Sequence, residues 1–102
     1  MSTLHTINNS PFESSSLESC LNHVSKGDAV LLIESAAFDA ERAPRTASSI
    51  KGAMGNCKVY ALAPDLSARG MNEDTVLDGI ELVDYGGFVD LVAEHERTQA
   101  WL

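Results

Sequence analysis

The sequence predicts a three-layer α/β/α fold with a mostly parallel sheet, formed by one domain that spans residues 1–102. Two observations predict this class. Apolar segments of strand length alternate along the chain with segments whose apolar residues recur at helical spacing, which is typical of parallel sheets with right-handed crossovers. The segment Ala29–Ile33 is apolar throughout, as expected of a strand that is covered on both faces. A chain of 102 residues is long enough for one domain and too short for two domains with separate cores.

The first two elements are a strand and a helix near the N-terminus. The strand is expected at Leu4–Ile7, because the turn-forming sequence Asn-Asn-Ser-Pro follows at residues 8–11. Ser15 and Glu18 fit the capping box of a helix start, in which each side chain satisfies a backbone N–H. The helix is then expected to reach Lys26-Gly27 and to present one apolar face, formed by Leu17, Cys20, Leu21 and Val24.

The remaining elements follow the same alternation. After the strand Ala29–Ile33, Pro44 is suited to begin a helix whose apolar stripe contains Ala47, Ile50 and Met54. Two further strands are expected at Cys57–Leu62 and Ile80–Asp84, separated by a short helix at Pro64–Arg69. The last predicted element is a helix that runs towards Trp101, with an apolar spacing set by Phe88, Leu91, Val92 and His95.

Charge and composition exclude several classes of partner. The chain has 7 lysine and arginine residues against 15 aspartate and glutamate residues, so its formal charge is -8 and its average surface repels nucleic acid and anionic membranes. No run of basic residues provides a local exception. The longest apolar runs are far below the ~20 residues needed to span a bilayer, and the first residues lack the features of a signal peptide. A cytoplasmic protein with reduced cysteines is therefore expected.

The carboxyl ends of parallel strands are where folds of this class place their sites. In this chain those ends are expected at residues 33–35, 62–65 and 84–87. The second of them leads into a loop with Asp65 and Arg69, but Pro64, Asp65 and Gly70 are already explained by the capping of a short helix. No reactive group is therefore predicted in this loop.

Motifs for other chemistry do not occur in the sequence. It contains neither a phosphate-binding glycine loop nor the G-x-S-x-G elbow of serine hydrolases. The two cysteines and three histidines show no metal-ligand spacing. We therefore predict neither a cofactor nor a metal ion.

Cys20 is the one candidate catalytic residue, and two interpretations of it stay open. A thiolate is favoured beside a protonated histidine, and His23 follows three residues later. However, Cys20 lies on the apolar face that is expected to pack against the sheet, where a free cysteine behaves as a small hydrophobe with a raised pKa. We expect Cys20 to serve mainly in packing. Cys57, at the start of a strand, is expected to be structural.

Several segments, in the same order, make the chain similar to a known family. They extend over almost the whole sequence: "LHTINNSPFE" (4–13), "GDAVLLIE" (27–34), "KVYALAPDLSARG" (58–70), "VDYGGFVDL" (83–91) and the terminal "QAWL". On these segments the chain resembles the DsrH/TusB proteins, which are small subunits of sulfur-relay complexes. The segment "SLESCL" at residues 16–21 looks closer to the DsrH branch of sulfur-oxidising bacteria than to the TusB branch of tRNA thiolation.

The resemblance implies a DsrE-like fold and assembly with DsrE-like and DsrF-like subunits into a heterohexamer that passes persulfide sulfur to a DsrC-like acceptor. It also implies that the reactive cysteine of the sulfur-carrying subunit lies in the loop after the third strand. At the corresponding place this chain has Ala63-Pro64 and no thiol. This departure argues against independent catalysis by this chain.

These observations favour a structural and partner-binding role in a sulfur-relay complex of sulfur oxidation. The alternatives are a sulfur carrier that uses Cys20, a TusB-like role in the synthesis of 2-thiouridine in tRNA, and a separate ligand-binding domain. Apolar residues outside the helical stripes are expected to contribute to an interface, namely Phe12, Phe38, Met71 and Trp101. For Trp101 the alternative is that it folds back on its own domain.

Overall fold

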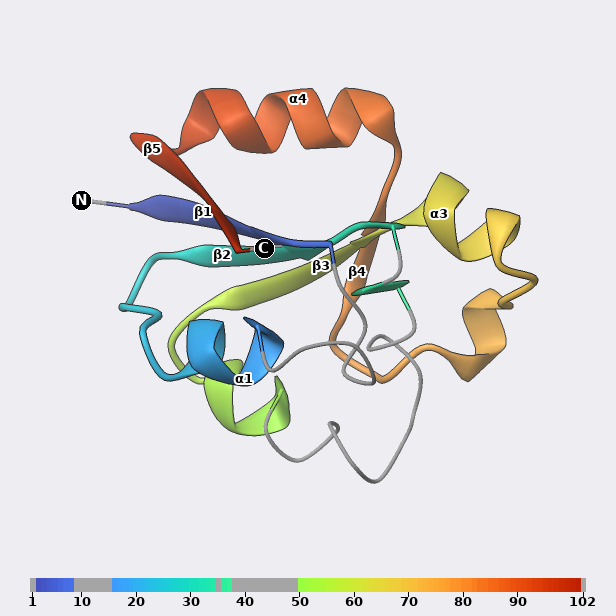
Figure 1. The fold of residues 1–102 in the computed structure, drawn as a ribbon, viewed down its shortest axis with the longest axis horizontal. Helices are drawn as coiled ribbons and strands as arrows, with labels where there is room; N and C mark the ends of the chain where they lie inside the picture. Colours follow the sequence, from blue (N-terminus) through green and yellow to red (C-terminus); the bar gives the residue numbers. More distant parts are fainter. Residues whose placement is uncertain (1, 9–15, 35, 38–49, 102) are drawn as a thin grey trace.

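The computed structural model describes residues 2–8, 16–34, 36–37 and 50–101. Its centre is a five-stranded sheet in the order β4-β3-β2-β1-β5, in which every neighbouring pair is parallel (Figure 1). The strands are β1 (Thr3–Ile7), β2 (Ala29–Leu32), β3 (Lys58–Leu62), β4 (Glu81–Val83) and β5 (Arg97–Trp101). The predicted α/β class with a parallel sheet is confirmed.

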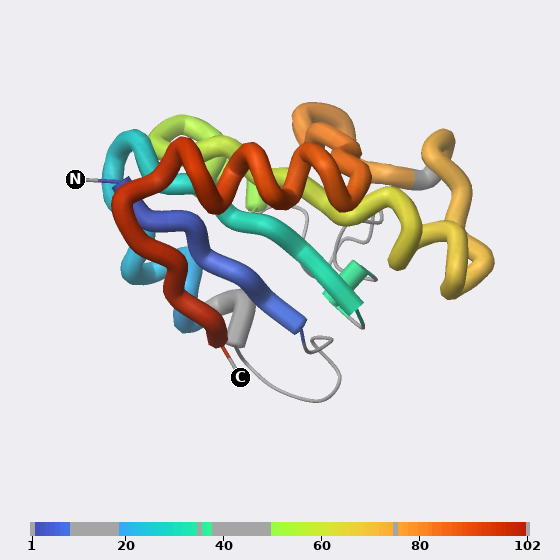
Figure 2. The backbone as a smooth tube through the Cα atoms, turned by 90° about the horizontal axis from the view of Figure 1, so that it is seen from above, coloured from blue at the N-terminus to red at the C-terminus, as the bar shows by residue number. Residues whose placement is uncertain are grey.

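Helices flank the sheet on both faces. α1 (Ser16–Leu21) and the helical residues 50–53 lie on one face, and α4 (Tyr85–Glu94) lies on the other (Figures 1 and 2). α3 (Ala63–Ala68) follows β3 directly, and the 3-10 helix η2 (Glu73–Thr75) comes after it. Within the described residues, no helix is long and apolar enough to cross a bilayer.

Alternate strand residues supply two separate cores. The core on the α1 side includes Ile7, Cys20, Val30, Leu32 and Ile50. The core on the α4 side includes Leu4, Ala29, Leu31, Tyr60 and Leu91. Because successive side chains of β2 enter different cores, the whole strand is apolar, as the sequence indicated.

The first helix is shorter than predicted. α1 ends at Leu21, and the backbone N–H groups of His23 and Val24 both donate to the carbonyl oxygen of Cys20, at 2.8 and 3.1 Å. Gly27 then adopts a φ of 92°, a left-handed conformation that glycine tolerates without strain. The predicted extension to Lys26-Gly27 is therefore wrong. Ser15 and the predicted helix start at Pro44 lie outside the described residues.

The C-terminal prediction is confirmed for α4 but wrong beyond it. Asp84 caps α4 by accepting the N–H of Gly87 at 2.8 Å, and Leu91 packs into the sheet core as predicted. The helix ends at Glu94, however, and residues 97–101 form β5 alongside β1. Pairing with β5 gives hydrogen-bond partners to the backbone N–H and C=O groups along the outer edge of β1. The free energy of this pairing outweighs the weak helix propensity of residues 97–101.

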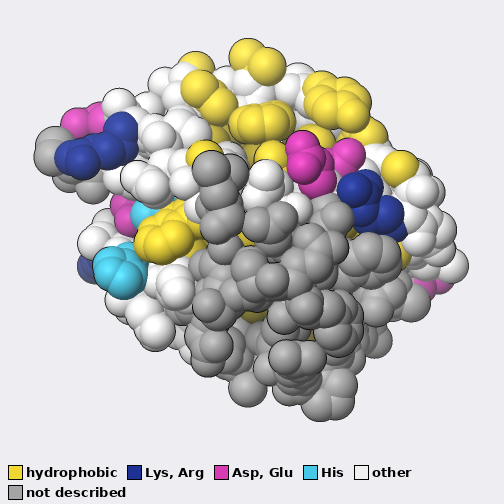
Figure 3. Space-filling model, in the orientation of Figure 1, with side chains coloured by type: hydrophobic (Ala, Val, Ile, Leu, Met, Phe, Trp, Pro, Cys, Tyr) yellow, Lys and Arg dark blue, Asp and Glu magenta, His cyan; other side chains and the backbone are white. Residues whose placement is uncertain are grey.

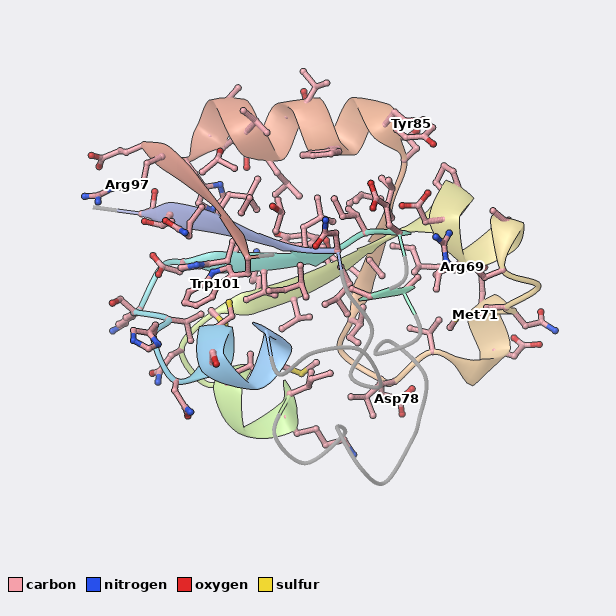
Figure 4. The ribbon with its side chains drawn as sticks, viewed as in Figure 1. Arg69, Met71, Asp78, Tyr85, Arg97 and Trp101 are labelled. Atoms are coloured by element: carbon pink, nitrogen blue, oxygen red, sulfur yellow. The ribbon has the colours of Figure 1, made fainter. Side chains whose placement is uncertain are left out.

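The apolar residues expected at an interface have different positions. Phe12 and Phe38 lie outside the described residues. Met71 and Trp101 are half-buried and pack against the core on the α1 side (Figure 4). Trp101 therefore folds back on its own domain, which was the alternative to an exposed anchor.

Candidate functional site

The segment after β2 and the start of α3 meet at the carboxyl ends of β2 and β3. The backbone N–H of Glu34 donates to Oδ2 of Asp65 at 2.6 Å and ties the two segments together. Arg69, which follows the last residue of α3, donates from Nη1 to the carbonyl oxygen of Asp65 at 3.2 Å. Figure 4 shows Arg69 at this end of the molecule. β3 passes directly into Ala63-Pro64, so its end offers structural contacts and no thiol.

Cys20 lies in the core on the α1 side, with none of its side chain exposed. Burial, together with the nearby Cys57 and Asp28, raises the pKa of the Cys20 thiol to about 12. Because the thiolate is the nucleophilic form, this environment lowers its reactivity. Cys57 is also buried, and its Sγ donates to the carbonyl oxygen of Ala53 at 3.4 Å. The geometry therefore favours packing over chemistry for both thiols.

His23 is exposed and makes its polar contact with its own helix. Its Nδ1 lies 2.7 Å from the carbonyl oxygen of Ser19 and donates to it. Its ring packs against Trp101, with the two ring centroids 5.6 Å apart and the planes inclined by 47°. The nitrogen engaged by Ser19 does not serve as a base for Cys20, and the ring instead supports the end of β5.

A hydrogen-bonded network that the sequence did not predict joins β1, β5 and the residue before β2. Trp101 donates from Nε1 to Nδ1 of His5 at 3.0 Å, and Nε2 of His5 lies 3.0 Å from Oδ2 of Asp28. Since an indole N–H can only donate, Nδ1 of His5 must accept. These contacts assign a neutral His5 whose proton is on Nε2 and is donated to Asp28.

Asp28 anchors this network at its buried end. It also accepts the backbone N–H groups of Thr3 and Ser25, each at 3.0 Å. Burial by itself raises the pKa of Asp28, but the hydrogen bonds from Ser25, His5 and Thr3 outweigh it and hold the pKa below its ordinary value of 3.8. Asp28 is therefore ionised at neutral pH, and hydrogen bonds from these donors stabilise its carboxylate.

The sequence contained only a faint signal for this network. His5 stands within an otherwise buried strand, and Asp28 directly precedes a strand that is apolar throughout, so both are polar residues at buried positions. An aspartate–histidine pair is also the acid–base part of a hydrolase triad. Here the third member is an indole N–H, which is no nucleophile. The network is suited to holding the C-terminal strand against β1.

A cavity of about 460 Å³ lies at the amino ends of β2 and β3. Charged residues of both signs line it, together with Cys57 and His95; the charged residues are Lys26, Asp28, Lys58 and Glu94. Within the described part of the chain, no group of three or more histidine, cysteine or acidic residues could hold a metal ion. The mixed charges of the cavity define no single class of ligand.

Comparison with known proteins identifies the family. Residues 9–98 match the family described as DsrH like protein. Protein TusB of Pectobacterium parmentieri is 33% identical over 98 residues, which cover 96% of this chain and 99% of the relative. Protein TusB of Escherichia coli strain K12 is 36% identical over 98 residues, with the same coverage. The chain belongs to the DsrH/TusB family. The resemblance found in its sequence is thereby confirmed.

Solved structures support the fold of this DsrH/TusB chain. Protein MTH1491 of Methanobacterium thermoautotrophicum superposes with a TM-score of 0.80 over 97% of both chains, at 15% identity. The ychN protein of Escherichia coli superposes with a TM-score of 0.78 over 99% of this chain and 100% of the other, at 14% identity. At these identities the similarity shows the fold alone. The family itself assigns the chain to the subunits of sulfur-relay systems.

Proposed function

We propose that this DsrH/TusB chain is a structural and partner-binding subunit of a cytoplasmic sulfur-relay complex. In this proposal it forms a heterohexamer with DsrE-like and DsrF-like subunits, and the complex passes persulfide sulfur to a DsrC-like acceptor during sulfur oxidation. The observation that carries the proposal is the placement of the thiols. In a chain of a sulfur-relay family, the residues directly after β3 are Ala63-Pro64 at the start of α3, and both Cys20 and Cys57 are buried.

Persulfide relay sets a chemical requirement that supports this division of roles. The thiolate of an acceptor cysteine attacks the outer sulfur of a donor persulfide, a new S–S bond forms, and the donor cysteine leaves as a thiolate. The outer sulfur moves without net oxidation or reduction. Each station therefore needs an accessible thiolate. Cys20 is fully buried with a pKa of about 12, so we assign the transfer to cysteines of the partner subunits.

Coexpression of a tagged chain with the DsrE-like and DsrF-like subunits of the same organism tests the proposal. We expect the three chains to copurify, and we expect the complex to deliver sulfur to a DsrC-like acceptor. The variant Cys20→Ala should assemble and deliver sulfur at nearly the wild-type rate. Cys57→Ala, at the other buried thiol, is the matched control. A Cys20→Ala complex that assembles fully but delivers no sulfur would establish Cys20 as a carrier, which is the alternative role.

A second candidate function is a TusB-like role in the synthesis of 2-thiouridine in tRNA. It is favoured by the curated relatives, several of which carry the name Protein TusB at 33–36% identity over 98 residues. The two functions share the relay but differ in the final acceptor. Deleting this chain should lower the persulfide content of the DsrC-like protein if the first function holds. Loss of 2-thiouridine from cellular tRNA, with that persulfide content unchanged, would establish the second.

A further inference from the structure

The exposed large hydrophobic side chains of the described residues all lie on one helix. Tyr85, Val89 and Val92 of α4 are 60%, 67% and 43% exposed. Figure 3 shows hydrophobic surface gathered along α4, at the top of the view. The other large apolar residues whose side chains the structure describes are buried or half-buried. We call Tyr85, Val89 and Val92 the α4 ridge.

The α4 ridge is regular and is not explained by packing within the domain. Its residues are spaced at i, i+4 and i+7, so they share one side of the helix. Phe88 and Leu91 are the residues of α4 that pack into the sheet core. A solvent-facing helix surface normally carries polar residues at these positions. An apolar outer side is typical of a helix that contacts another protein.

The layer to which α4 belongs is thin. Among the described elements, α4 is the one helix on its face of the sheet, and it connects the edge strand β4 to the opposite edge strand β5 (Figures 1 and 2). On this face, a helix of 10 residues, roughly 15 Å long, is the described cover of a five-stranded sheet. A partner that rests on the α4 ridge would thicken this layer.

The charges around the α4 ridge indicate the kind of partner. Asp84 and Asp90, the chain neighbours of Tyr85 and Val89, are exposed, and residues 84–96 contain no lysine or arginine. We call Asp84 and Asp90 the acidic rim of the ridge. Glu94 lies elsewhere, in the wall of the cavity that also contains Lys26 and Lys58. A second copy of this chain would bring acidic rim against acidic rim, which is unfavourable. A surface with lysine or arginine around an apolar centre would be complementary in charge.

We propose that the α4 ridge docks a different protein chain, whose contact surface is apolar at its centre and basic at its rim. The inference rests on the proposed function, because it takes that chain to be another subunit of the sulfur-relay complex. Tyr85, which Figure 4 shows at the beginning of α4, is the anchor, since aromatic residues dominate such contacts. The ridge is smaller than the ~800 Å² that each partner of a stable interface buries, so it forms the centre of a larger contact.

Substitution of Val89 in the intact complex tests the docking surface. Val89→Asn removes apolar contact from the centre of the α4 ridge without changing the charge, and Ala68→Asn makes the same kind of change on an exposed position of α3. Both variants are coexpressed with the DsrE-like and DsrF-like subunits. We expect Val89→Asn to weaken retention of the chain in the complex on the order of tenfold. Ala68→Asn should be retained like the wild type.

The charge of the rim has a separate readout. Asp90→Asn should slow assembly and should make it less sensitive to salt, because the acidic rim steers a basic partner. A photocrosslinking residue in place of Val92 provides a measurement that does not depend on the stability of any ridge variant. It should crosslink to a partner subunit in the assembled complex, whereas the same residue in place of Ala68 should not.

Three results would overturn the inference, and they separate it from the proposed function. If the wild type assembles and position 92 crosslinks to no partner, or Val89→Asn is retained normally, the ridge is not the interface and the proposed function stands. If the purified chain forms a dimer that Val89→Asn abolishes, the occupant is a second copy. If the wild type does not assemble with the two subunits at all, the proposed function fails and the inference fails with it.

Discussion

At the scale of the residue, burial decides the chemistry of Cys20 more than the sequence around it does. The nearby histidine suggested an activated thiol, but His23 donates its Nδ1 hydrogen to the Ser19 carbonyl and packs its ring against Trp101. Cys20 itself is fully buried, and its pKa is raised to about 12. A reactive thiol needs exposure and a lowered pKa, and Cys20 has neither.

This environment predicts slow alkylation of Cys20. With a pKa of about 12, its thiolate fraction at pH 8 is on the order of one in ten thousand, and the folded chain must open locally before a reagent reaches it. Iodoacetamide labelling followed by peptide mass spectrometry should show much slower modification of Cys20 in the native chain than in denaturant. Complete labelling of the native chain at the denatured rate would contradict the burial of this thiol.

Asp28 is the residue whose charge we expect to matter for folding. Its pKa is lowered in the folded chain, so its contribution to stability is present above its ordinary pKa of 3.8 and is lost as the pH falls through the lower folded value. At pH 7, Asp28→Asn should reduce the free energy of unfolding by about 1–3 kcal/mol. The gap between the variant and the wild type should narrow below pH 3.8.

Urea unfolding at pH 7 and at pH 3 measures this gap. Asp90→Asn, at an exposed aspartate of α4, is the matched control and should change the stability at pH 7 by less than about 0.5 kcal/mol. A gap that is unchanged at pH 3 would show that the ionised carboxylate of Asp28 is not the source of the effect.

At the scale of the element, β5 depends on contacts rather than on its own sequence. Its first four residues are exposed, and its ladder to β1 and the side chain of Trp101 hold it in place. Trp101→Ala should lower the free energy of unfolding by about 2–3 kcal/mol through lost packing, whereas Trp101→Phe should cost about 1 kcal/mol, mainly through the lost hydrogen bond to His5.

Circular dichroism during urea unfolding compares the two Trp101 variants, because neither of them retains the only tryptophan of the chain for fluorescence. Equal stability of Trp101→Ala and the wild type would mean that Trp101 does not hold β5. Its role would then have to be sought in an interface, as the sequence alone first suggested.

The elements show which features a sequence can predict. β2 and β3 were predictable because burial of both faces requires an apolar run, and α4 because its apolar residues recur at helical spacing. β5 was not, because a mostly exposed edge strand needs no apolar pattern. The network of His5, Asp28 and Trp101 was missed as well, because predicting it requires knowing that β5 exists and where it pairs. It exists only once β5 is paired with β1, which brings together residues 96 positions apart.

At the scale of the whole molecule, an acidic chain combines buried thiols with an exposed apolar ridge on α4. Such a chain is expected to gain stability from a partner, since any protein that binds only the folded state stabilises it. Partner subunits at one hundred times their dissociation constant should add about 2.7 kcal/mol to the free energy of unfolding. Thermal melting of the chain with and without the DsrE-like and DsrF-like subunits measures this shift. An identical melting temperature in both samples would contradict a partner-binding role.

The most direct test of the central claim is the mass of each subunit after the assembled complex has been exposed to a persulfide donor. We expect a partner subunit to gain the mass of one sulfur atom, whereas this chain gains none because Cys20 and Cys57 are buried. The gain on the partner should disappear when the complex is treated with a reductant, which returns its persulfide to the thiol. A gain of one sulfur atom on this chain that Cys20→Ala abolishes, together with loss of sulfur delivery to the acceptor, would contradict a purely structural role and make Cys20 a carrier in the relay.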